Sequence, residues 1–497
     1  MLVVVLLVVV VVVALLGGVH WYVWRRLVRD TTAPGGVARR VGTAAAWGLP
    51  VLTVGALVSG RAGAPFWLER VLAWPGYLWL AVLLYLTLGL VVGEGVRPLL
   101  RRVLERNSPT PPYPETGGQA PQPPEPAAGF AAATVAAAVD THAAVPAGAE
   151  SADPAAVAAA PAACAGAFGT PEPGDPGTAA APPAAAAVDT HAADPVPARA
   201  EPVDPTQLTE AADPGAAAEP GAVLSRRLFV SRVVGGSAAA VALGTVGYGT
   251  YGVLRGPRVK RVTVPLGKLP RAAHGFRIAV VSDIHLGPIL GRAHSQRIVD
   301  TINATSPDLV AVVGDLVDGS VADLGAAAEP LAQLRARHGA FFVTGNHEYF
   351  SGAEEWVDHV RELGLRPLQN ERVEIAGFDL AGVNDVAGES EGDGPDFGKA
   401  LGDRDRARAS VLLAHQPVVI HDAVKQGVDL QLSGHTHGGQ LWPGNYLAAL
   451  ANPTVAGLEQ YGDTQLYVTR GAGAWGPPVR VGASSDITVV QLASRQA

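Results

Sequence analysis

Two histidines stand two positions apart in the stretch "LSGHTHGGQLWPG", residues 432–444, among small residues and glycines. His435 and His437 could bind metal ions through their imidazole nitrogens, or they could lie on a polar turn without any ligand. The pair alone does not separate these alternatives, because H-x-H sequences also occur by chance. The choice depends on the chemistry that the rest of the chain offers.

Four further segments carry residues that ligate metals or move protons, and each directly follows an apolar run. They are "SDIHLG" with Asp283 and His285, "GDLVDG" with Asp315 and Asp318, "GNHEYF" with Asn346, His347 and Glu348, and "AHQP" with His415. Alternate residues of a strand end point the same way, so Asp283 and His285 can reach one ion; the H-x-H pair can share an ion or reach two. One such segment is weak evidence for a site, whereas five in order are strong evidence. Unpaired polar side chains that converge at strand ends would cost desolvation free energy without return unless they bound a ligand.

A framework for these residues is visible from Val262 onward, where β-rich runs alternate with polar, helix-compatible stretches. The runs are "RIAVVSD", "DLVAVVGD", "AFFVTGNH", "SVLLAH", "VDLQLSGH", "QLYVTRG" and "DITVVQL". This alternation predicts an α/β domain with a largely parallel or mixed sheet. Ligands of such sheets gather at the carboxyl ends of strands, and five of the runs end in a potential metal ligand.

The ordered set D-x-H, G-D-x-x-D, G-N-H-E, H and G-H-x-H resembles the calcineurin-like metallophosphoesterases over roughly Gly275 to Leu492. The longer forms "LLAHQP", "LSGHTHGGQLWP" and "LYVTRGAGAWGPPVR" are most similar to the bacterial membrane-associated branch of YkuE type. The resemblance implies an α/β sandwich of mixed β-sheets flanked by helices. It also implies hydrolysis of a phosphate ester by attack of a hydroxide that bridges two metal ions.

The resemblance further assigns ligands to two divalent metal ions. One ion would be bound by Asp283, His285, Asp315 and His437, and the other by Asp315, Asn346, His415 and His435, with Asp315 as the bridge. Carboxylate, amide and imidazole donors without thiolates suit Mn, Fe or Zn.

His347 is not a ligand in this family and is predicted to be catalytic, donating a proton to the leaving oxygen or stabilising phosphoryl charge. The alternative for His347 is a role in orienting a ligand, the role that Asp318 and Glu348 are expected to have. The other histidines of the domain are expected to be surface residues or hydrogen-bonded core residues: His274, His294, His338, His359 and His421.

The N-terminal part of the chain has the composition of a membrane region. Residues 2–24 form an apolar run long enough to cross a hydrocarbon core of about 30 Å. Further spans are predicted from Val41 to about Gly60, from Trp74 to Gly93 and from Val233 to Leu254. Because the second of these contains Pro50, a buried or re-entrant helix is the alternative for it. The predicted divisions are a membrane region at 1–106 with about three spans, a linker at 107–222, an export motif and fourth span at 223–256, and the catalytic domain at 262–497.

The predicted linker is rich in Ala and Pro and has few large apolar residues, so it is expected to be disordered. It contains fourteen acidic residues against one basic residue, Arg199, so the net charge of −8 carries no information about the substrate. The only cysteine, Cys164, also lies there, which excludes a disulfide within the chain and a thiolate metal cage.

The motif "SRRLF", with Arg226 and Arg227, resembles a twin-arginine export signal; an ordinary fourth span with basic flanks is the alternative. Arginines crowd the first loop and the end of the third span, which predicts a cytoplasmic linker and an outward fourth span. The sequence therefore predicts a multi-pass protein of the bacterial cytoplasmic membrane whose catalytic domain is extracytoplasmic and stays anchored.

The predicted function is a membrane-anchored, two-metal phosphoesterase that acts on a lipid-linked or other cell-envelope phosphate. Its expected partners are the phosphate-ester substrate, the membrane and the twin-arginine translocase, with no stable nucleic-acid partner. The alternatives are a phosphodiesterase for nucleotides or nucleic acid, and a non-catalytic envelope scaffold. Loss of a ligand would favour the scaffold, and each predicted ligand is present.

Overall fold

The computed structural model describes residues 2–106, 226–375 and 377–496 of the 497-residue chain. The predicted linker, with Cys164 and Arg199, lies outside the described residues.

Four helices among the described residues are long and apolar enough to cross a membrane, by length and composition. They are α1 (Leu2–Trp24), which continues into a π-helical turn at Arg25–Arg29, α2 (Val37–Val58), α3 (Phe66–Arg106) and α4 (Arg226–Leu254). Each helix overlaps one predicted span. α2 continues through Pro50 as one helix of 22 residues, and α3 extends well beyond its predicted span, to 41 residues.

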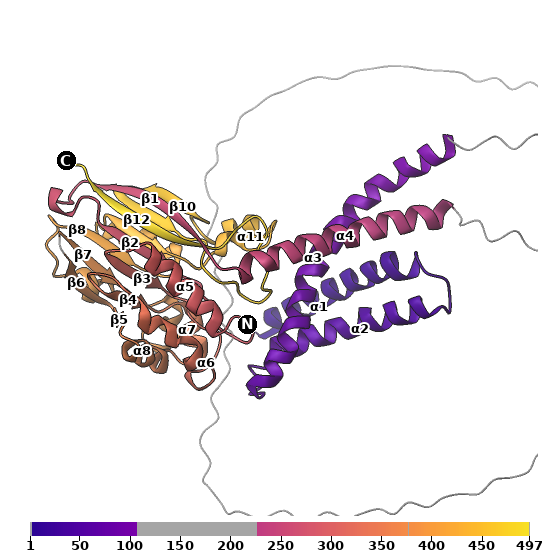
Figure 1. The fold of residues 1–497 in the computed structure, drawn as a ribbon, viewed down its shortest axis with the longest axis horizontal. Helices are drawn as coiled ribbons and strands as arrows, with labels where there is room; N and C mark the ends of the chain where they lie inside the picture. Colours follow the sequence, from indigo (N-terminus) through magenta and orange to yellow (C-terminus); the bar gives the residue numbers. More distant parts are fainter. Residues whose placement is uncertain (1, 107–225, 376, 497) are drawn as a thin grey trace, which may run out of the picture. The chain divides into compact units, whose positions relative to one another are not determined.

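The remaining described residues form two six-stranded mixed sheets (Figure 1). The first has the order β1-β12-β2-β3-β4-β5, and the second β10-β11-β9-β8-β7-β6. The strands of the first sheet are β1 (Arg258–Leu266), β2 (Arg277–Val281), β3 (Leu309–Val313), β4 (Ala340–Val343), β5 (Arg366–Pro367) and β12 (Asp486–Ser494). Those of the second are β6 (Glu371–Ile375), β7 (Phe378–Gly382), β8 (Ala409–Leu413), β9 (Leu430–Ser433), β10 (Gly457–Tyr461) and β11 (Thr464–Val468).

The strands are uninterrupted apolar runs because both faces of each sheet are covered. In β3, Leu309, Ala311 and Val313 belong to the core between the sheets, whereas Val310 and Val312 belong to a second core beneath the helices. Successive side chains of a strand alternate between faces, so a strand covered on both sides reads as a continuous apolar run. This agrees with the expected α/β sandwich.

Helices cover the outer faces of both sheets. Those of the first sheet are α5 (Arg292–Ala304), α6 (Val321–Ala328) and α8 (Ala353–Glu362), which follows the short α7 (Asn346–Ser351). α9 (Phe397–Leu401) and α10 (Ile420–Lys425) cover the second sheet, and α11 (Gly444–Ala451) has no buried residue. Buried residues recur every three or four positions in α5, at Ile298 and Ile302, as expected for a helix with one face on the core.

The strands β2, β3 and β4 are adjacent and parallel, and so are β8 and β9 in the other sheet. Parallel neighbours have their carboxyl ends at one edge of a sheet, where ligands of α/β proteins bind. These five strands precede the five segments that carry the predicted site residues.

Candidate metal centre

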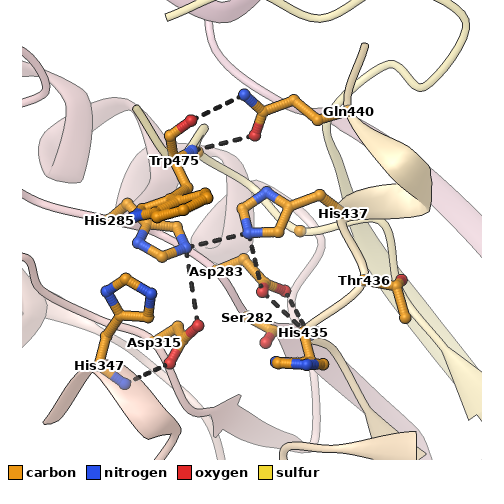
Figure 2. A network of polar contacts seen from close by, with 12 residues as sticks. Ser282, Asp283, His285, Asp315, His347, His435, Thr436, His437, Gln440 and Trp475 are labelled. Atoms are coloured by element: carbon orange, nitrogen blue, oxygen red, sulfur yellow. Dashed lines mark hydrogen bonds and ion pairs between the residues drawn. The ribbon is translucent and has the colours of Figure 1, made fainter. Parts of the chain in front are cut away.

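The loops after the five strands bring the predicted site residues into one cluster. Asp283 and His285 follow β2, Asp315 follows β3, and Asn346 and His347 begin α7 after β4. From the second sheet, His415 follows β8, and His435 and His437 follow β9. Figure 2 shows side chains from both sheets pointing toward one another.

A first group consists of Asp283, His285 and His437, which are buried and whose ligand atoms all lie within 4.8 Å of one another. The two Nε2 atoms of His285 and His437 are 3.0 Å apart. The His437 Nε2 atom is also 3.3 Å from Asp283 Oδ1 (Figure 2). Three donor atoms therefore face one small volume.

A second group consists of Asp315, His415 and His435. Asp315 Oδ2 is 3.1 Å from His415 Nε2 and 3.7 Å from His285 Nε2, so this carboxylate lies between the two groups. Asn346 joins the second group, because its Oδ1 is 3.0 Å from His435 Nδ1. All seven predicted ligands thus meet in two groups that share the neighbourhood of Asp315.

Five of these seven residues have left-handed backbone conformations, with positive φ angles. They are Asp283, His285, Asp315, His435 and His437, with φ between 48° and 70°. Only three other non-glycine residues among the described residues have positive φ. Such conformations cost about 1–3 kcal/mol each and persist where the surroundings impose them, which is common at functional sites.

Asp318 orients two of the histidines. Its Oδ1 accepts from His285 Nδ1 at 3.0 Å and lies 2.6 Å from His347 Nδ1. Burial raises the pKa of Asp318, but the two imidazoles outweigh burial and hold the pKa below its usual value. The contact leaves His285 Nε2 free to face the metal group.

Glu348 connects the loops after β3 and β4. Its carboxylate accepts hydrogen bonds from the backbone N–H groups of Asp315 at 3.0 Å, Leu316 at 2.7 Å and Gly345 at 2.6 Å. Burial, and then the charge of Asp315, raise the pKa of Glu348 to about 7. The supporting roles expected for Asp318 and Glu348 agree with these contacts.

His347 lies at the mouth of the cluster, with 15% of its side chain exposed. Its backbone N–H donates to Asp315 Oδ1 at 2.9 Å, and its ring packs edge-on against His285. Because Asp318 engages Nδ1, Nε2 is the ring nitrogen that can face a substrate. Geometry also groups His347 with His285 and Asp315 as atoms near enough to share an ion.

No role for Arg480 is predicted from the sequence, although the segment "PPVR" that contains it stands out there. This buried guanidinium donates to the His437 carbonyl at 3.0 Å and to the Gly473 carbonyl at 2.7 Å, and Nη2 is 3.1 Å from His437 Nδ1. Burial lowers the pKa of Arg480 to about 10, so it remains a cation at neutral pH. Arg480 therefore positions His437 from the side opposite the cluster.

A second residue without a predicted role is Asp385, which follows β7, a strand that is not among those predicted from the sequence. Its Oδ1 accepts from Gln416 Nε2 at 2.9 Å, beside His415 in sequence. Burial raises the pKa of Asp385 to about 6. Burial lowers the pKa of His415, but Asp315, followed by Asp283 and Asp385, outweighs it and raises the pKa well above its usual value.

Among the remaining histidines, His294 departs from expectation. It is buried in α5, and neither ring nitrogen has a hydrogen-bond partner within the described residues. The prediction of a surface or hydrogen-bonded residue is therefore wrong for His294. Burial lowers its pKa to about 3, so it stays neutral. By contrast, His274 accepts a hydrogen bond from the Ser494 backbone.

The donor distances fit divalent metal ions. Two atoms that each bond one ion at about 2.1 Å lie about 3 to 4 Å apart. The separations of 3.0, 3.1 and 3.3 Å within the two groups, and of 3.7 Å between Asp315 and His285, lie in this range. In addition, the buried His415 Nε2 makes no directed hydrogen bond among the described residues. Oxygen and imidazole donors of this kind suit Mn, Fe or Zn.

Comparison with known proteins gives consistent matches to metallophosphoesterases. A sequence model described as calcineurin-like phosphoesterase matches residues 276–439. A transmembrane protein with metallophosphoesterase domain from Danio rerio is 40% identical over 259 residues, which cover 49% of this chain and 59% of that protein. This chain therefore spans less than two thirds of the length of that relative.

Two bacterial relatives are covered more fully. An uncharacterized metallophosphoesterase from Helicobacter pylori is 38% identical over 256 residues, covering 50% of this chain and 68% of that protein. The metallophosphoesterase YkuE of Bacillus subtilis is 29% identical over 290 residues, covering 54% of this chain and 98% of that protein.

Proposed function

We propose that this chain, which belongs to the calcineurin-like metallophosphoesterases, is a metal-dependent phosphoesterase whose two ligand groups form one binuclear site that hydrolyses a phosphate ester. The observation that carries this proposal is the position of Asp315, whose Oδ2 faces His415 from one group and His285 from the other. Two divalent ions bound there would polarise the phosphoryl group and lower the pKa of the attacking water.

We assign the ligands by their places in the two groups. Asp283, His285 and His437 would bind one ion, Asn346, His415 and His435 the other, and Asp315 both. The support for this assignment is the set of short donor separations and the burial of most of these side chains. Arg480, Asp318 and Glu348 would keep the ligands in place through the contacts described above.

His347 would act on the leaving group. Its Nδ1 lies 2.6 Å from Asp318 Oδ1, which leaves Nε2 as the ring nitrogen that can face a substrate. A proton on Nε2 can then pass to the leaving oxygen as the ester bond breaks, or it can stabilise charge on the phosphoryl group.

The proposed substrate is a lipid-linked or cell-envelope phosphate ester. Membrane association supports this choice, since the described residues include four helices apolar enough to span a membrane, and a relative is named a transmembrane protein with metallophosphoesterase domain.

The test is hydrolysis by the full-length protein purified in detergent and loaded separately with Mn²⁺, Fe²⁺ or Zn²⁺. The substrates are p-nitrophenyl phosphate, bis(p-nitrophenyl) phosphate and phosphatidic acid, and Asp315→Asn serves as the matched inactive variant. We expect metal-dependent release of phosphate or nitrophenol by the unaltered protein alone. Equal rates for the unaltered protein and Asp315→Asn would contradict the proposal.

We further propose the topology of a multi-pass protein of the bacterial cytoplasmic membrane: a membrane region at 1–106, a linker at 107–222, a twin-arginine motif with a fourth span at 223–256, and an extracytoplasmic catalytic domain at 262–497. The arginines of the first loop and of the end of α3 support this orientation.

The topology is tested by adding protease to intact spheroplasts. We expect the catalytic domain to be removed, and the double variant Arg226→Lys with Arg227→Lys to leave it protected, because the translocase reads the arginine pair. If the catalytic domain of the unaltered protein is cleaved only after the cells are lysed, the domain lies in the cytoplasm and the proposed topology fails.

A further inference from the structure

Large apolar side chains are exposed around α11 and the mouth of the metal centre. Leu447 and Leu450 of α11 are 71% and 84% exposed, and none of the residues of α11 is buried. We define the apolar rim as the six exposed residues Phe350, Trp442, Tyr446, Leu447, Leu450 and Trp475. Large apolar side chains exposed beside a candidate functional site mark an interaction surface.

The rim adjoins the metal centre directly. The rings of Phe350 and Trp475 pack edge-on against His347, at centroid distances of 5.6 and 5.8 Å. The backbone N–H of Trp475 donates to Gln440 Oε1, and Gln440 Nε2 donates back to the Trp475 carbonyl (Figure 2). Gln440 lies between His437 and Trp442, so the rim and the ligand loop are parts of one unit.

The membrane helices contact this same edge of the domain. Tyr85 of α3 donates its hydroxyl to the Trp442 carbonyl at 2.9 Å. Leu441 and Val481, from the loops beside the rim, pack in a cluster with α3 and α4 residues that include Leu83 and Val246.

A second set of contacts comes from α4. The Arg480 N–H donates to the Gly249 carbonyl at 3.4 Å, and Val253 packs with Leu290 and Ala474. Leu290, Ala474 and Arg480 lie in loops after β2 and β11, on the edge that carries the metal ligands. The helices that would cross the membrane therefore contact the domain on the side of the site.

This continuity with the four apolar helices favours a lipid bilayer as the surface that covers the rim. The outward residues Leu243, Tyr248 and Tyr251 of α4 are exposed among the described residues, as lipid-facing positions of a spanning helix are. Tryptophan and tyrosine are enriched at membrane interfaces, where one end of the ring is apolar and the other is wet. A short helix with exposed leucines beside these aromatics has the composition of an interfacial helix.

We propose that the apolar rim inserts into the bilayer beside α3 and α4 and presents the metal centre to phosphate esters of amphiphiles whose apolar part remains in the membrane. The claim about hydrolysis rests on the proposed function, whereas insertion of the rim is a separate physical claim. A protein partner or a second copy of the chain on the rim is the competing outcome.

Insertion is tested on the full-length chain in nanodiscs of phosphatidylethanolamine and phosphatidylglycerol. In a Cys164→Ala background, Leu450→Cys carries a fluorophore that lipid-borne doxyl groups quench. The matched control is Arg337→Cys, a residue 78% exposed that precedes β4 at the opposite end of the strand. We expect quenching several-fold stronger at position 450. Equal quenching at the two positions would overturn insertion and favour a protein contact.

Delivery of substrate is tested with the double variant Leu447→Ser and Leu450→Ser in the same nanodiscs. We expect hydrolysis of phosphatidic acid to fall about 10-fold while hydrolysis of p-nitrophenyl phosphate is unchanged, because only the lipid ester needs the rim. Equal changes for both esters, or no hydrolysis of phosphatidic acid by the unaltered protein, would overturn the delivery role. If p-nitrophenyl phosphate is also not hydrolysed, the proposed function itself fails, and quenching still decides insertion.

Discussion

Substitution of Gly345 by alanine tests whether close packing around Asp315 keeps its carboxylate in the position that binds metal. A Cβ on Gly345 would lie 2.5 Å from the Asp315 backbone N, closer still to Asp315 Oδ1, and 3.0 Å from His415 Cδ2. Ordinary contacts are 3.4–4 Å, so Asp315 would have to move by about 1 Å in a well-packed interior. The φ angle of Gly345 is −108°, so alanine adds no backbone strain there.

The size of the effect follows from the precision that metal ligands need. Ligand distances are held within about 0.2 Å, so a displacement of about 1 Å at the shared carboxylate is well outside tolerance. Misplacement on this scale costs about 10²-fold in rate. We therefore expect Gly345→Ala to lower kcat/KM about 10²-fold and to reduce the bound metal, with an overpacking penalty of about 1–3 kcal/mol.

The assay measures hydrolysis of p-nitrophenyl phosphate, metal content by elemental analysis and secondary structure by circular dichroism. The matched control is Gly267→Ala, in the turn after β1, where an added Cβ meets no atom within 4 Å. The control should keep activity and metal. The reasoning is refuted if Gly345→Ala retains both metals and full activity, because Asp315 would then tolerate the displacement.

Three other outcomes are expected. Asp315→Asn and His437→Ala should each abolish hydrolysis and lower metal content without unfolding the domain, as measured by elemental analysis and circular dichroism; normal metal content would remove them from the ligand set. His347→Ala should keep both metals and lose about 10²-fold to 10⁴-fold in rate, and full activity would exclude it from the mechanism. His294 has a pKa of about 3 in the folded protein, whereas unfolded histidine takes up a proton near pH 6.5, so stability should fall as pH drops below about 6.5, by up to about 1.4 kcal/mol per pH unit. His294→Leu should reduce that slope in denaturant titrations between pH 4 and 7, and an unchanged slope would contradict the assignment.

Several features were predictable from the sequence because local patterns encode them. The apolar runs that became β2, β3, β4, β8 and β9 end directly before polar segments, so the position of each candidate ligand at a strand end follows from composition alone. The four long helices follow in the same way from uninterrupted apolar stretches. By contrast, β6 and β10 are largely polar and partly exposed, and β5 has two residues, so they carry little local signal.

Only the tertiary structure decided which residues face one another. His285 and His437 are 152 positions apart, yet their Nε2 atoms are 3.0 Å apart because the two sheets stack with their ligand-bearing edges together. The position of Arg480 behind His437 and the exposure of Leu450 likewise depend on the packing of distant loops. A local pattern specifies strand or helix and the face a side chain takes, whereas contacts across a core depend on how whole elements pack, which no short stretch of sequence encodes.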